Sequence, residues 1–123
     1  MSRAVTLKRG ETPEQQRIRN VDNTALPDAA PTERAEGVDL QGGDFLHVYV
    51  RLNNGAAGAT IVPWYWSKTN GLWHPSTAIA FTAADLSRRV EVRGEDAVYF
   101  QVTVLAAGDV DIWGSFSYEG SEG

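Results

Sequence analysis

The stretch IVPWYWSKTNGLWH, residues 61–74, holds three of the four tryptophans of the chain and one of its four tyrosines. Two aromatic-rich runs flank residues 67–71. Asn70 and Gly71 form the dipeptide that best tolerates positive φ at a tight turn, so the stretch predicts a β-hairpin. Aromatic side chains bury about 150–250 Å² each, and this hairpin is therefore expected to dominate the packing of a small domain.

Strand patterns continue on both sides of the hairpin. Residues 45–52, FLHVYVRL, alternate between two faces, with Leu46, Val48 and Val50 on the apolar one. Residues 97–105 and 110–118 alternate in the same way, which places Phe100, Val102 and Ile112 inside. About seven or eight short strands separated by turn signals predict an all-β fold, an antiparallel β-sandwich or jelly roll.

Residues 1–44 differ from the rest of the chain. They contain no Trp, Tyr or Phe, and their net charge changes from +3 over residues 1–19 to −5 over residues 20–44. Such a segment buries too little apolar surface to order alone. We expect an extended N-terminal arm over 1–44, which orders on a partner, and a β-sandwich domain over 45–123. The residues expected to contact the partner are Arg3, Val5, Leu7, Arg9, Arg17, Ile18 and Leu26.

Composition excludes several classes of protein. The 123 residues suffice for one domain, and no cysteine is present to form disulfides or thiolate sites. The net charge of −5 argues against a nucleic-acid partner. No run of about 18 apolar residues is present to span a membrane, and the first residues lack the apolar region of a secretory signal.

No pattern in the chain indicates catalysis. The two histidines, His47 and His74, lack the further ligands that a zinc site needs. Asp109 and Asp111 fit a turn residue and an exposed strand residue better than a calcium site. The sequence carries no carboxylate pair in a predicted cleft, no nucleophile elbow and no phosphate loop. We therefore expect no enzymatic activity, no cofactor and no metal.

The aromatic side chains are the remaining candidates for a binding surface. If Trp64 and Trp66 share one face of their strand, the opposite face is apolar as well, so one face needs a cover outside the sandwich. Trp113 alternates out of the inward set and is expected beside Tyr99 of the preceding strand. A patch of Trp64, Trp66, Tyr99 and Trp113 would bind a sugar ring, a sister subunit or the N-terminal arm, or belong to the core.

The layout resembles the small auxiliary proteins of tailed-phage virions, and most of all the head decoration proteins. The resemblance lies in the polar arm over residues 1–44, the strand FLHVYVRL and the run VYFQVTVLAAGDVDIWGSFSY over residues 98–118. It covers the whole chain in architecture and includes no diagnostic motif.

This resemblance implies a structural protein without catalysis that binds the outer surface of an assembled capsid and stabilises or decorates it. The implied partners are a major capsid protein or another virion protein and sister copies in a homo-oligomer, a trimer, with neither nucleic acid nor membrane. The implied location is the capsid surface, after synthesis in the host cytoplasm. Two alternatives stay open: a carbohydrate-binding β-sandwich that uses exposed tryptophans to hold a glycan, and a tail or baseplate component.

Overall fold

The structure, a computed structural model, describes residues 16–118, and the predicted aromatic hairpin is present in it. Strand β4 (Gly58–Ser67) pairs with β5 (Leu72–Pro75), and Trp66 lies opposite Trp73. Residues 68–71 form the turn, which the backbone N–H of Gly71 closes by donating to the carbonyl oxygen of Ser67 at 2.8 Å. Only Gly71 of the Asn-Gly pair has positive φ, +66°, while the Asn70 side chain accepts a hydrogen bond from the Leu72 N–H.

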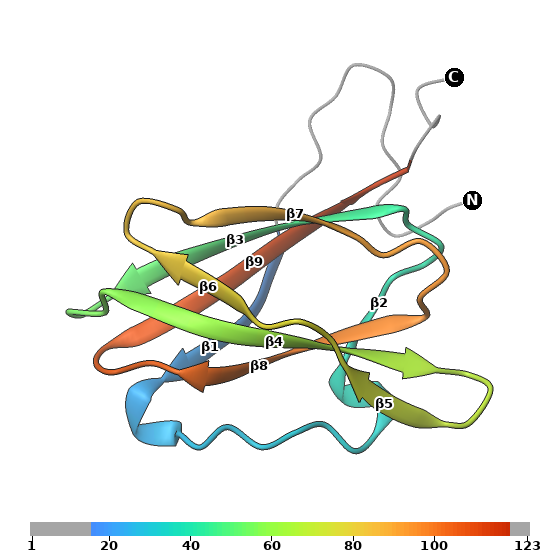
Figure 1. The fold of residues 1–123 in the computed structure, drawn as a ribbon, viewed down its shortest axis with the longest axis horizontal. Helices are drawn as coiled ribbons and strands as arrows, with labels where there is room; N and C mark the ends of the chain where they lie inside the picture. Colours follow the sequence, from blue (N-terminus) through green and yellow to red (C-terminus); the bar gives the residue numbers. More distant parts are fainter. Residues whose placement is uncertain (1–15, 119–123) are drawn as a thin grey trace.

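The other described strands join this hairpin in two antiparallel sheets (Figure 1). We call the sheet with strand order β1-β9-β3-β7 sheet A, and the sheet with strand order β2-β8-β4-β5 sheet B; β6 also pairs with β4. The bounds are β1 (Gln16–Asp22), β2 (Val38–Asp39), β3 (Phe45–Asn53), β6 (Ile79–Thr82), β7 (Ser87–Glu91), β8 (Ala97–Val104) and β9 (Asp109–Ser117), with 3-10 helices η1 (Asn23–Ala25) and η2 (Arg34–Glu36).

This strand order is that of a jelly roll. β5 and β6 pair with successive halves of β4, so together they occupy the place of one strand. With the two taken as one, each sheet has four strands, and the chain crosses repeatedly from one sheet to the other. The prediction of an all-β, antiparallel β-sandwich with jelly-roll character is confirmed.

The core lies between the two sheets, as the alternation predicts. Leu46, Val48 and Val50 of β3 are buried, and so are Phe100 and Ile112 on the strands from the second half of the chain. These residues belong to a single buried cluster, to which Leu40, Ile61, Phe81, Val92, Val98, Val102, Val110 and Phe116 also belong.

One strand departs from strict alternation. The alternation of Phe100 and Val102 also predicts Val104 inside, but Val104 is 57% exposed, and the next residue, Leu105, is buried. The cause is a register shift: Ile61 of β4 pairs with Val102, but the preceding residue Thr60 pairs with Val104. The extra residue on β8 is a bulge, which reverses the faces of the residues that follow it.

Pro63 in β4 lies opposite the gap between β5 and β6. Its carbonyl accepts a hydrogen bond from the Ser76 N–H at 2.8 Å, and Ser76 lies between β5 and β6. The N and O of one residue point to the same side of an antiparallel strand, so the N–H that proline lacks would face this break. Pro63 therefore lies where the pairing with β5 ends and the pairing with β6 has not begun, and β4 remains an inner strand of sheet B.

Residues 16–44 belong to the sandwich and not to a separate arm. β1 pairs with β9 over the whole length of β1, and β2 pairs with β8. Val21 and Leu40 are buried in the core, where they supply apolar area that the other strands alone would lack. In the described residues the sandwich therefore begins at β1 and not at residue 45, where the sequence predicted its start. Residues 1–15 of the predicted arm lie outside the described residues.

An amide network closes the end of the sandwich where β3 turns into β4. The Asp109 carboxylate accepts hydrogen bonds from the side-chain amides of Asn20, Asn53 and Asn54 at 2.6–3.1 Å. These hydrogen bonds stabilise the ionised carboxylate and lower the pKa of Asp109 below its ordinary value near 3.8. Asp109 therefore joins β1, β9 and the β3–β4 turn.

Candidate functional site

Three of the four residues of the predicted aromatic patch share one surface. Trp64 and Trp66 project from the outer face of sheet B, since Ile61, Pro63 and Tyr65 of the same strand point into the sandwich. Tyr99 of β8 lies opposite Trp64 in the ladder and joins them. Burial raises the pKa of the inward hydroxyl of Tyr65 to about 12.

The fourth residue, Trp113, lies elsewhere, and this corrects the sequence prediction. β8 and β9 follow each other in the chain but belong to different sheets, so Tyr99 and Trp113 are not neighbours. The turn between them crosses from sheet B to sheet A and makes no hairpin. Trp113 lies opposite Tyr49 of β3 on the outer face of sheet A.

Trp73 of β5 completes the aromatic surface of sheet B. Its ring lies 5.4 Å from that of Trp66 in an edge-to-face arrangement and 6.3 Å from that of Tyr99. Although Trp73 projects from the outer face, it is only 8% exposed. The cover comes from the β1–β2 connection, residues 23–37, where the Glu33 carbonyl accepts a hydrogen bond from the Trp73 indole at 3.2 Å.

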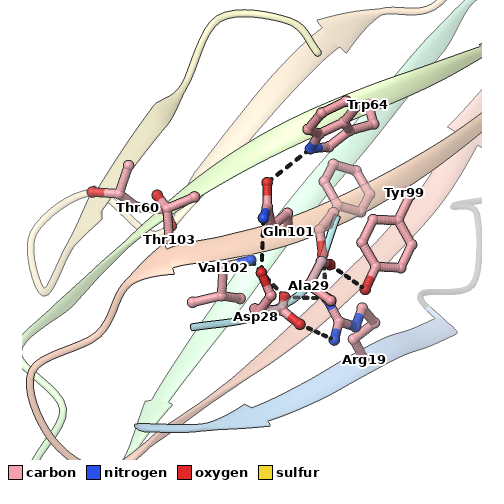
Figure 2. Close-up of polar contacts among 10 residues, drawn as sticks. Arg19, Asp28, Ala29, Thr60, Trp64, Tyr99, Gln101, Val102 and Thr103 are labelled. Carbon is pink, nitrogen blue, oxygen red and sulfur yellow. Dashed lines mark hydrogen bonds and ion pairs between the residues drawn. The ribbon is translucent and has the colours of Figure 1, made fainter. Parts of the chain in front are cut away.

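Asp28 fastens this connection to the edge of sheet B (Figure 2). Its carboxylate accepts two hydrogen bonds from the Arg19 guanidinium, at 2.7 and 3.0 Å, and one from the Val102 N–H at 2.9 Å. Val102 lies on β8 beyond the short ladder with β2, so Asp28 satisfies a strand edge that no strand covers. The Asp28 carbonyl also accepts a hydrogen bond from Gln101, which in turn accepts one from the Trp64 indole.

Electrostatics at this junction favours the ion pair between Arg19 and Asp28. Burial disfavours the charge of Arg19, but the hydrogen bonds and the charge of Asp28 outweigh it, and the pKa of Arg19 is raised. The guanidinium carbon of Arg19 lies 4.8 Å from the ring centre of Tyr99, a cation–π distance. Burial raises the pKa of the Tyr99 hydroxyl, although the charge of Arg19 opposes that shift.

The outer face of sheet A has a partly exposed aromatic pair at its centre. Tyr49 is 44% exposed, and Trp113 beside it is half-buried. Arg17 lies opposite Trp113 on the other side and forms an ion pair with Asp111 at 3.2 Å. No segment within residues 16–118 crosses this face in the way that the β1–β2 connection covers part of sheet B.

The structure places the predicted partner-contact residues of the arm in different environments. Arg3, Val5, Leu7 and Arg9 lie outside the described residues. Arg17 is exposed on the face of sheet A. Ile18 and Leu26 pack against the core of this same chain, so they already have an intramolecular partner.

A polar hollow at one end of sheet B was not anticipated from the sequence. It has a cavity volume of about 640 Å³, and a second hollow of about 520 Å³ adjoins it. Trp66 lines both hollows together with charged side chains from three separate loops. The only sequence signal was that residues 67–71 and Gly94 with its neighbours are turns, which does not reveal that they meet.

Neither a metal cluster nor a membrane span is found in the part of the chain that the structure describes. Residues 16–118 contain no group of three or more His, Cys, Asp or Glu side chains placed to hold a metal ion. No helix within the same range has the length and hydropathy needed to cross a bilayer.

The fold and the surfaces together define an all-β jelly-roll domain with aromatic side chains on the outer faces of both sheets. Comparison of the chain with protein-family models, with curated proteins and with solved structures returned no match. Its function must therefore be argued from the surfaces themselves.

Proposed function

We propose that this chain is a non-enzymatic structural protein that binds the outer surface of an assembled phage capsid. The observation that carries the proposal is the partly exposed pair of Tyr49 and Trp113 at the centre of sheet A. Aromatic side chains and arginine are enriched in protein interfaces, and Arg17 and Arg51 flank this pair. The jelly roll itself is used by viral capsid proteins and by lectins, so the fold supports the proposal without distinguishing the two.

The attachment point of the N-terminal residues supports the same surface. β1 is an edge strand of sheet A, and its first residue, Gln16, pairs with Gly114 next to Trp113. The first residue that the structure describes therefore lies at the edge of this face. A capsid surface that contacts Trp113 would also be within reach of Arg3 and Arg9, which would meet acidic groups there.

The proposal includes sister copies around a symmetry axis, as a trimer, and a capsid or other virion protein as partner. It assigns no catalysis. Two of the carboxylates in the described residues are engaged by neighbouring side chains, Asp28 by the Arg19 guanidinium and Asp109 by the amides of three asparagines. Such carboxylates hold the fold together, whereas a general base needs an available proton acceptor.

Co-sedimentation with assembled capsids of tailed phages tests the proposal. Trp113→Ala and Tyr49→Ala are expected to weaken binding at least about 10-fold, because truncated aromatic anchors dominate interface energetics. Leu72→Ala is the matched control, since Leu72 is an exposed apolar residue of sheet B, away from this face. A second arm of the test reverses the charges of Arg3 and Arg9 to Glu in the full chain.

Two results would contradict the proposal. The first is unchanged capsid binding by both aromatic variants while their thermal melts match that of the parent protein. The second is failure of the parent protein to bind any capsid tested. Retention of binding by the charge-reversed chain would instead restrict the contact to the face of sheet A.

A further inference from the structure

The hollow at the end of sheet B is built from three loops that are distant in the sequence. The turn of the β4–β5 hairpin contributes Lys68, the β7–β8 turn contributes Glu95 and Asp96, and the connection before β2 contributes Arg34. Its two compartments share Trp66, Lys68 and Asp96 among their linings. The larger compartment, about 640 Å³, lies within the size range of sites for small organic ligands.

The charged side chains of the lining pair with one another. The Arg34 guanidinium donates a hydrogen bond from Nε to Asp96 at 2.7 Å and lies 3.7 Å from Asp39. Lys68 Nζ lies 3.7 Å from the other oxygen of Asp96. The hydrogen bond from Arg34 lowers the pKa of Asp96. Asp96 therefore stays ionised with its cations arranged around it before any ligand arrives.

Trp66 supplies the one aromatic wall and is also held in place. Its ring packs edge-to-face on Trp73, whose indole donates to the Glu33 carbonyl. An aromatic ring whose position is fixed loses little conformational entropy when a ligand stacks on it. The hollow thus combines a single preorganised aromatic surface with hydrogen-bonding groups of both kinds.

The charge of the lining argues against an anionic ligand. Two cations, Arg34 and Lys68, are balanced by Asp39 and Asp96, and Glu95 adds one negative charge. Within residues 16–118 no hydrogen bond or ion pair joins the Glu95 carboxylate to another side chain. A free carboxylate accepts hydrogen bonds from two hydroxyl groups and repels an anion. This lining fits a neutral, polyhydroxylated molecule.

We propose that this hollow is a binding site for a neutral oligosaccharide. The apolar C–H face of one pyranose ring stacks on Trp66, while its hydroxyl groups donate to Glu95 and Asp96 and accept from Arg34 and Lys68. The second compartment gives room for an adjoining sugar unit along the β4–β5 turn. The site belongs to sheet B, so it is independent of the docking face of sheet A.

The test begins with an array that carries immobilised neutral and acidic oligosaccharides, probed with the full-length protein. Binding to a neutral oligosaccharide is expected, followed by quenching or enhancement of tryptophan fluorescence when the same soluble sugar is titrated. Because the ligand is uncharged, affinity should change less than about twofold between low and high salt. Binding only to acidic glycans, or to no glycan at all, overturns the proposal.

Two variants then locate the site. Trp66→Ala is expected to weaken binding by about 30-fold or more, as loss of a central aromatic anchor does. Glu95→Gln keeps the shape of the side chain and removes its charge, and about 10-fold weaker binding is expected because charged acceptors form the stronger hydrogen bonds.

Matched controls keep this result decisive. Leu72→Ala changes the same hairpin outside the hollow, and Glu91→Gln makes the same chemical change on β7 of sheet A. Both should bind sugar as the parent does. If Trp66→Ala does not fold, the sugar affinity of Glu95→Gln alone tests the site. Sugar binding that is unaffected by Glu95→Gln, or a titration in which a lysine-rich peptide displaces the sugar and binds more tightly, overturns the proposal.

Discussion

The outer faces of the two sheets carry similar aromatic side chains but have different neighbours. On sheet B, the β1–β2 connection lies against Trp73 and Tyr99 and is fastened at Asp28. On sheet A, Tyr49 and Trp113 lie side by side in the ladder with no described segment across them. Both faces have a tryptophan next to a tyrosine, and within residues 16–118 only the face of sheet B is covered by another segment.

This difference shows that aromatic content alone does not mark a partner surface. The tryptophan that packs under the connection is structural, because its indole hydrogen bond is satisfied within the chain. An aromatic residue that stays uncovered in the single chain is the better candidate for an intermolecular contact. Substitutions at the cover of sheet B, compared with matched surface controls and with a substitution on sheet A, test this distinction.

The largest effect is expected from Asp28→Ala, which would release the cover of sheet B. The substitution leaves the Val102 N–H without its acceptor and the Arg19 guanidinium with the Phe100 carbonyl alone, in a position where the side chain of Asp28 is only 10% exposed. A loss of about 2–4 kcal/mol of unfolding free energy is expected. Urea unfolding measures it, and hydrogen exchange should increase over residues 28–37.

Asp85→Ala is the matched control for that loss. Asp85 pairs with Arg88 at 2.6 Å, as close as the 2.7 Å of Asp28 and Arg19, but its side chain is 50% exposed. An exposed pair of this kind contributes about 0–1 kcal/mol. Equal losses in the two variants would show that the Asp28 junction does not hold the connection more firmly than a surface ion pair does.

A smaller effect is expected from Gly37→Ala, which crowds the same cover from within. A Cβ at this position would overlap the Trp73 ring and lie 2.9 Å from the Val98 carbonyl oxygen. Overpacking of this kind costs about 1–3 kcal/mol. A double-mutant cycle with Trp73→Phe measures the contact, because the smaller ring should relieve most of the cost. An additive cycle would place the strain elsewhere.

The smallest effect is expected on sheet A, where Asp109 lies in its amide network. Its folded pKa is lower than in the unfolded chain, so its contribution to stability is complete above about pH 4. That contribution is lost as the pH falls through the folded pKa. Asp109→Asn should therefore flatten the acid limb of stability below about pH 4, measured by urea unfolding. Glu91→Gln, the control, should leave the acid limb unchanged. An acid limb in Asp109→Asn as steep as that of the parent protein would contradict the assignment.

The parts of the fold that were predictable depend on local patterns. The hairpin follows from Asn70 and Gly71 between aromatic runs, and the buried face of β3 follows from alternation at Leu46, Val48 and Val50. The place of Trp113 was not predictable in this way. Residues 106–108 form a turn whether the next strand returns to the same sheet or crosses to the other, and only distant partners decide between them.

The candidate sites were hidden for the same reason. Arg34 and Asp96 are separated by 62 residues, and no periodicity connects them. The polar composition of residues 16–44 predicted an arm because few apolar residues are present, yet Val21 and Leu40 are buried in the core and Ile18 and Leu26 pack against it. Average composition conceals a segment that contributes only a few buried side chains.

The pairing of β1 with β9 has a mechanical consequence. Gln16 lies opposite Gly114 and Asp22 lies opposite Asp109, so the described chain enters and leaves sheet A at the same end of one ladder. Tension between residues 16 and 118 would act across the strands and load their hydrogen bonds one after another. We expect β1 to peel away from β9 at low force, while β3 and β7 are still paired. A molecule held at one end and pulled at the other would therefore yield first on the sheet that carries Trp113.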